Sequence, residues 1–171
     1  RRFGRADARW LDVLAQQAAV AIENARLFHI LRVGKQEWQE TFDSIGEGIA
    51  VVGREGRVLR ANVAFAALAG RDVREVVGVP VAELFAGRTR STTEGPADLV
   101  DEAVRTATSV EAQVELDGPY RVLRAAAYPS TQGATLVLRD VTALVVLEER
   151  HRRIVEAVSD AVVITSGPDR R

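Results

Sequence analysis

The hydrophobic and polar positions of the chain change their period several times, and each period predicts a different element. Between residues 7 and 33, apolar side chains recur at alternating steps of three and four, which is typical of one face of a long helix. These residues are Leu11, Leu14, Ala18, Ala21, Ala25 and Phe28. A polar helical segment follows at residues 35–44, and Gly34 between the two costs a helix only about 1 kcal/mol. The long helix either covers an adjoining core or pairs with a second helix, and its pattern fits both roles.

Short apolar runs and turn residues predict a hairpin and then several helices in the middle of the chain. The runs at residues 49–52 and 57–60 flank a turn that contains Gly56, so they are expected to pair as a β-hairpin. Asn62 and Gly70 bracket a short helix as its N-cap and its closing glycine. Further helices are expected at residues 73–77, 81–85 and 97–107.

The next part of the chain alternates with the period of two that strands require. The strand at residues 110–116 places four apolar residues on one face, namely Val110, Ala112, Val114 and Leu116. Two more strands are expected at residues 120–128 and 133–139, and a helix from residue 141 to about 158. This helix has Leu144, Leu147, His151, Ile154 and Val158 at heptad spacing. The order predicts an α+β domain with one sheet of about five strands.

One stretch of the chain occurs twice. The segment that begins at Phe42 returns at Val155, 113 residues later (155 minus 42), and apolar positions match apolar positions. A repeat of this kind identifies the unit of folding. The second copy ends with the sequence at residue 171, so we expect one complete unit and the beginning of another.

Composition excludes several kinds of chemistry. The chain has no cysteine, which rules out disulfides, zinc–thiolate sites and a cysteinyl adduct to a flavin. Its formal net charge of −1 gives no electrostatic reason to expect binding to nucleic acid or to an anionic membrane. No apolar run approaches the roughly 18 residues of a membrane span.

The predicted order and several short motifs resemble the PAS domain, a sensory module of bacterial signalling proteins. The matching motifs are EGIAVVG (47–53), GRVLRAN (56–62), AFAALAG (64–70), VVG (76–78), ELF (83–85) and RDVT (139–142). The resemblance covers residues 36–142 and starts again near Ile154. It implies a five-stranded antiparallel sheet with short helices on one face, flanked by long signalling helices.

The N-terminal helix resembles the last helix of a GAF domain. The two resemblances together imply four parts: a GAF-like helix and linker at residues 1–33, a PAS-like domain at 34–142, an exit or coiled-coil helix at 143–160, and the start of a second PAS-like domain at 161–171. They imply a cytoplasmic, multidomain bacterial protein whose output domain these residues do not identify.

The resemblance places a candidate pocket between the sheet and the short helices. Its lining would be Ile49, Val51, Phe65, Leu68, Val81, Leu84, Phe85, Leu123, Ala125, Ala127, Leu136 and Leu138. The same residues would equally make a filled core. The small side chains of residues 125–127 favour a cavity, whereas alternation puts Arg124 and Tyr128 on the face opposite Ala125.

The resemblance also implies a signalling hinge at Asp140 and Thr142, where the last strand becomes the exit helix. A simpler role for either residue is to cap the start of that helix, and both roles are compatible. Asn62 is expected to cap its helix rather than to contact a ligand.

Catalysis, haem and metal binding are not expected. In the PAS family haem is usually held by a histidine of the helices within the domain, and residues 61–108 contain none. His151 lies on the exit helix but is followed by Arg152, whereas the histidine-kinase pattern has a carboxylate there.

We therefore expect a non-enzymatic module that relays a signal through dimeric helices, with or without a small apolar ligand. The alternatives are a ligand-free dimerisation scaffold and the dimerisation region of a histidine kinase.

Overall fold

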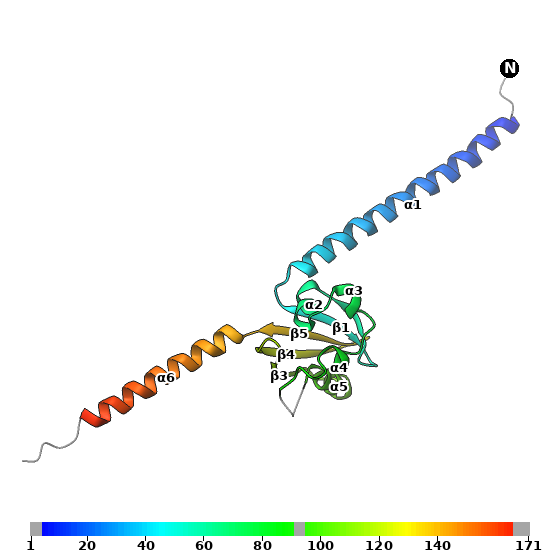
Figure 1. Ribbon diagram of the computed structural model, residues 1–171. Helices are drawn as coiled ribbons and strands as arrows, with labels where there is room; N and C mark the ends of the chain where they lie inside the picture. Colours follow the sequence, from blue (N-terminus) through cyan, green and yellow to red (C-terminus); the bar gives the residue numbers. More distant parts are fainter. Residues whose placement is uncertain (1–4, 91–94, 166–171) are drawn as a thin grey trace, which may run out of the picture. The chain divides into compact units, whose positions relative to one another are not determined.

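The chain divides into two units, residues 1–44 and residues 45–171, each described here by itself. The first consists of a long helix, and the second contains a sheet, four short helices and an exit helix (Figure 1). The structure, a computed structural model, describes residues 5–90 and 95–165, and the side chains of residues 16–90 and 95–156 among them.

Within the first unit, residues 5–44 form a single uninterrupted helix, α1 (Arg5–Ser44). The two predicted segments are joined because Gly34 continues the helix; the small cost of one glycine does not outweigh the hydrogen bonds of the turns on either side. Ala18, Ala21, Ala25 and Phe28 of the predicted apolar face are exposed. Leu11 and Leu14 lie outside the described side chains.

The second unit is built on a five-stranded antiparallel sheet, which confirms the predicted α+β class. The strands are β1 (Gly48–Gly53), β2 (Val58–Ala61), β3 (Val110–Leu116), β4 (Arg121–Ser130) and β5 (Gly133–Asp140). They lie in the order β2-β1-β5-β4-β3, so the first and last strands of the domain are neighbours at its centre. Gly48 pairs with Leu138 in that register, and the chain therefore enters and leaves the sheet at the same end.

Four helices connect the two halves of the sheet: α2 (Val63–Ala69), α3 (Val73–Val76), α4 (Val81–Leu84) and α5 (Pro96–Thr106). Alternate residues of the strands and the apolar residues of these helices form one buried cluster. Phe65 of α2 meets Phe85 edge to face in this core, with ring centroids 5.9 Å apart. The cluster contains only residues of the second unit.

The exit helix, α6 (Thr142–Thr165), follows β5 directly and extends beyond the predicted end near residue 158. The repeat equates residues 161–165 with residues 48–52, which form most of β1, yet residues 161–165 are helical. A strand needs partner strands for its backbone hydrogen bonds, whereas a helix satisfies them within its own segment. Leu144, Leu147, His151 and Ile154 are exposed on α6, and Val158 lies outside the described side chains.

Candidate functional site

The junction between β5 and α6 brings the two predicted hinge residues into contact. Asp140 Oδ1 accepts a hydrogen bond from the backbone N–H of Thr142 at 3.0 Å and another from its hydroxyl at 2.5 Å. The first orphan N–H group of α6 is therefore satisfied by the last residue of the strand. Asp140 thus bonds the start of the helix, a role that the sequence left open between Asp140 and Thr142.

The same junction is bonded to the neighbouring strand. The hydroxyl oxygen of Thr142 accepts a hydrogen bond from Val122 N at 2.9 Å, and Val141 N donates to Val122 O at 2.9 Å. Val122 is fully buried. The last registered pair between β4 and β5 is Leu123 with Asp140, so these two bonds extend the strand pairing into the first residue of the helix.

Arg121 completes the junction. Its Nη1 atom lies 3.4 Å from Asp140 Oδ2, and about two fifths of each side chain is exposed. An ion pair this exposed contributes about 0–1 kcal/mol, so it helps to orient the carboxylate more than it stabilises the fold.

The electrostatics of the junction keep Asp140 ionised. Burial by itself raises the pKa of Asp140, but the hydrogen bonds from the hydroxyl and the backbone of Thr142, together with the charge of Arg121, outweigh it. The net result is a pKa below the ordinary value for aspartate. The carboxylate is therefore available as an acceptor at neutral pH.

The sequence suggested Asp140 and Thr142 as a hinge, which stays a prediction, and it did not suggest Arg121 and Val122, which contact them in the structure. These residues lie about twenty positions away on another strand, and nothing in the local pattern marks them. Their role depends on the register between β4 and β5, which becomes visible only in the folded sheet.

The entry to the domain is held by Asn62. Its Oδ1 atom accepts hydrogen bonds from Ile49 N and Phe65 N, both at 2.9 Å, and the second of these caps α2 as predicted. Its Nδ2 atom donates to Glu47 O at 2.8 Å and to Ile45 O at 3.4 Å. Among the described side chains, Asn62 is the one polar side chain that is buried.

An ion pair connects this entry to the exit. Glu47 Oε1 lies 3.6 Å from Arg139 Nε, one residue before Asp140. The Arg139 side chain is largely exposed and that of Glu47 is partly exposed, so the pair is weak in water. It nevertheless shows that the entry segment and the exit junction lie next to each other on adjacent strands.

The candidate pocket residues lie in the core, with two exceptions. Phe65, Leu68, Val81, Leu84, Phe85, Leu123, Ala125, Ala127, Leu136 and Leu138 all belong to the buried cluster. Ile49 and Val51 do not, and their expected place toward the core is wrong: Gly48, Ala50 and Val52 are the buried residues of β1.

Close packing of α2 against β1 explains this reversal. A Cβ atom on Gly48 would lie 2.8 Å from Leu68 Cδ1 and 3.0 Å from Phe65 Cα, so no larger side chain fits there. Gly48, Ala50 and Val52 therefore face the core, and the partly buried Ile49 and Val51 face the other way. The small residues Gly48 and Ala50 at alternate positions were the signal in the sequence.

The interior offers apolar contacts and little polar chemistry. Ala125 and Ala127 face the core, while Arg124 and Tyr128 are exposed on the opposite face, as alternation predicted. The buried amide of Asn62 already makes hydrogen bonds within the domain. A molecule placed among the core residues would thus meet almost entirely hydrocarbon.

The two histidines of the chain lie on its long helices. His29 and His151 are exposed on α1 and α6. Within the described residues, no group of three or more histidine, aspartate or glutamate side chains is placed to hold a metal ion. No helix in that part of the chain is long and apolar enough to cross a membrane.

Comparisons with known proteins agree with this architecture. A family model described as the PAS fold matches residues 42–146. The PAS domain of a protein from Colwellia psychrerythraea is similar at 22% identity with a TM-score of 0.51, over 65% of this chain and 98% of that one. The PAS domain of an HTR-like protein from Haloarcula marismortui is 17% identical with a TM-score of 0.51, over 68% and 98%.

At 22% and 17% identity, these two structures show a similarity of fold alone. No curated protein matches the chain in sequence. The family match covers more than half of the chain, and the five-stranded antiparallel sheet with its short helices agrees with it. The chain belongs to the PAS family, with residues 42–146 forming its PAS-fold domain.

Proposed function

We propose that this chain is a sensory relay module, in which a change in the sheet of the PAS domain alters the start of α6. The observation that carries the proposal is the position of the Thr142 hydroxyl. It donates to Asp140 at the end of β5 and accepts from Val122 on β4, so one side chain joins two strands to the exit helix.

The relay follows from the energetics of these bonds. A shift of β4 relative to β5 would move Val122 away from Thr142 or Asp140 away from the helix start. An N-cap interaction stabilises a helix by about 0.5–2 kcal/mol, so its loss would loosen the first turn of α6. A stimulus needs only a few kcal/mol of differential interaction to change the populations of two such arrangements.

Replacement of Thr142 tests this proposal. Thr142→Val keeps the shape of the side chain but removes the hydroxyl, whereas Thr142→Ser keeps the hydroxyl. We expect faster amide hydrogen exchange at Val122 and in the first turns of α6 for Thr142→Val, and exchange close to wild type for Thr142→Ser. Amides of β1 and β2 should be unchanged in both variants. Unaltered exchange of α6 in Thr142→Val would contradict the relay.

Packing of the interior favours a relay that works without a bound small molecule. The candidate pocket residues, apart from Ile49 and Val51, are nearly or fully buried against their own neighbours, and the polar atoms of Asn62 are engaged. Native mass spectrometry of the purified chain distinguishes the two possibilities. A retained small molecule would show that the domain senses a ligand directly.

The proposal includes association of two copies through the flanking helices. Its support is the exposure of large apolar side chains on both, including Phe28 and Leu31 on α1 and Leu144 and Ile154 on α6. In the longer protein that we infer from the repeat and from the GAF resemblance, these helices would connect the PAS domain to its neighbours. Sedimentation at several concentrations measures the association.

A further inference from the structure

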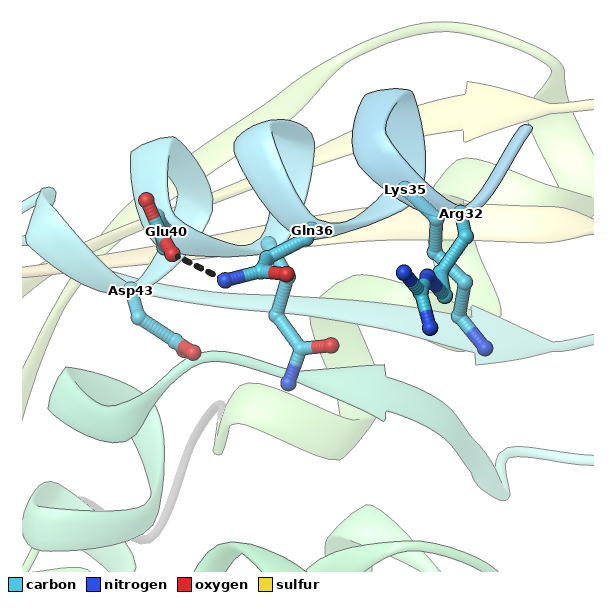
Figure 2. A pocket seen from close by; sticks show the side chains of 6 residues that line it. Arg32, Lys35, Gln36, Glu40 and Asp43 are labelled. Carbon is cyan, nitrogen blue, oxygen red and sulfur yellow. Dashed lines mark hydrogen bonds between the residues drawn. The ribbon is translucent and has the colours of Figure 1, made fainter. Parts of the chain in front are cut away.

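A shallow hollow on the surface of α1 offers a ligand little beyond a helix surface. Six residues of this one helix line it: Arg32, Lys35, Gln36, Gln39, Glu40 and Asp43. Figure 2 shows Gln36 hydrogen-bonded to Glu40, at 2.9 Å. All six side chains except that of Asp43 are exposed, so water competes for their polar atoms. Polar side chains that join distant segments lie in the PAS domain instead.

Arg88 joins the end of α2 to the turn between β3 and β4. Its Nη1 atom donates a hydrogen bond to Leu68 O at 3.0 Å, and its Nε atom donates a longer one to Asp117 O at 3.5 Å. Its own carbonyl accepts a hydrogen bond from Asp117 N at 2.7 Å. Leu68 and Asp117 lie 20 and 29 positions away from Arg88 in the sequence. A single residue therefore connects two segments that only the folded domain brings together.

The end of α2 explains why a cation is useful at this position. The carbonyls of Ala66 and Ala67 accept hydrogen bonds from backbone N–H groups just beyond the helix. Arg88 supplies the donor for the next carbonyl, that of Leu68. The carbonyl end of a helix carries a partial negative charge, which a guanidinium group stabilises. Because this bond is charge-assisted and part-buried, it is stronger than an exposed bond between neutral groups.

A short strap of the chain, residues 88–90, runs antiparallel to the end of β3. Arg90 N donates a hydrogen bond to Glu115 O at 2.8 Å. Arg90 Nε lies 3.2 Å from Asp117 Oδ1, and the guanidinium carbon lies 5.4 Å from the ring centre of Tyr120. More than half of each side chain in this ion pair is exposed, so the pair itself is weak. The strap therefore holds the turn mainly through its backbone and its first residue.

The turn that the strap holds leads directly into the exit junction. Arg121, the first residue of β4, comes directly after this turn and lies 3.4 Å from the Asp140 carboxylate. The next residue, Val122, is hydrogen-bonded to Thr142 at the start of α6. We infer that Arg88 is a positioning residue of the relay, which couples the position of α2 to the start of α6 through the turn between β3 and β4.

Each step of this link is a direct contact or a few residues of chain. α2 contributes Phe65 and Leu68 to the core, so a change in core packing reaches this helix. Movement of α2 would carry the strap and the turn with it for as long as the bond between Arg88 and Leu68 holds. The start of β4 would then shift relative to β5, which is the displacement that the relay responds to. Contiguous packed and hydrogen-bonded groups can carry coupling between distant sites in this way.

This inference deepens the proposed function and rests on the relay from β4 to α6. It adds a means of regulating that relay from the helices of the domain. The Thr142 variants test the relay without any change at Arg88, so a negative result at Arg88 leaves the relay standing.

Replacement of Arg88 in the full chain tests the coupling. Arg88→Met removes the donors and keeps most of the length of the side chain. We expect amide hydrogen exchange at Val122 and in the first turn of α6 to become faster by about threefold or more, and exchange in β1 and β2 to be unchanged. A role limited to general stability would instead speed exchange throughout the sheet by a common factor, and that result would overturn the inference.

Combination with Thr142→Val separates coupling from independent effects. If Arg88 acts through the bond between Val122 and Thr142, Arg88→Met adds little to the exchange of α6 once Thr142→Val is present. Effects that multiply would show that the two residues act independently and would overturn the inference. Unaltered exchange of α6 in Thr142→Val alone would overturn the relay and the inference together.

Arg71→Met is the matched control. Arg71 also lies just after α2, but its Nη2 atom lies 3.7 Å from Glu83 Oε1 on α4. Loss of this arginine should leave the exchange of Val122 and α6 as in wild type, and an effect equal to that of Arg88→Met would overturn the inference. If Arg88→Met does not fold, Arg88→Lys takes its place in the same comparisons, because lysine keeps the cation but not the forked donor geometry.

Discussion

Asn62 shows how one side chain can connect several segments at the entry to the domain. It caps α2 through Phe65 N and also binds the entry segment through Ile49 N and the Glu47 carbonyl. The sequence predicted the cap because an N-cap is a local feature. The other contacts are made with residues more than ten positions away, and no local pattern indicates them.

A second single residue, Asp140, makes the free energy of unfolding depend on pH. Its pKa is lowered in the folded state, so the folded protein holds this proton more weakly than the unfolded chain does. The contribution of ionised Asp140 to the free energy of unfolding is fully present above the ordinary aspartate pKa of about 3.9. This contribution is lost as the pH falls through the lower pKa that Asp140 has in the folded state.

We therefore expect wild type to be more stable than Asp140→Asn at pH 5, and this advantage to shrink as the pH falls below about 4. Urea unfolding of both proteins at a series of pH values measures it, and the other carboxylates cancel in the difference. Because about two fifths of the Asp140 side chain is exposed, solvent screens the effect and keeps it small. An advantage independent of pH would show that the carboxylate charge does not matter.

At the scale of elements, the faces and ends of the strands depend on their neighbours. The predicted spans of the strands agree with the structure to within a residue or two, because turn residues such as Gly56 mark where strands end. The buried face of β1 was predicted wrongly, since the resemblance placed Ile49 and Val51 toward the core. What decides the face is how closely α2 approaches Gly48, a property of two packed elements.

The close pairing of β1 with β5 gives a second prediction. A Cβ atom on Gly133 would lie 2.2 Å from Val52 O, and its φ of 151° is one that other residues rarely adopt. We expect Gly133→Ala to lower the free energy of unfolding by more than about 1 kcal/mol from the backbone conformation alone, and by more again from the clash. Gly46→Ala is the control, because nothing lies within 4 Å of its Cβ position. Equal urea midpoints for both variants would contradict this account.

At the scale of the whole molecule, the two units differ in what holds them together. The PAS domain has a continuous core, to which residues 16–44, the part of α1 whose side chains the structure describes, contribute none. A domain with its own core is expected to fold alone.

A chain without residues 1–33 should therefore keep the free energy of unfolding of its PAS domain within about 0.5 kcal/mol of the full chain, the range typical of changes remote from a core. Amide exchange of the most protected residues of β4 and β5 measures this free energy. A large loss of protection would mean that α1 stabilises the domain.

Local patterns were enough to predict the α+β class and the order of the elements, which the structure confirms. The hinge at Asp140 and Thr142 came from the family resemblance and stays a prediction. Periodicity, caps and turns act over a few residues, and a few residues of sequence therefore reveal them. Contacts between distant segments settled the rest: the central place of β1 beside β5, the buried side of β1, and the bonds from β4 to the start of α6. These features depend on which surfaces meet when the chain folds, so no short stretch of the sequence predicts them.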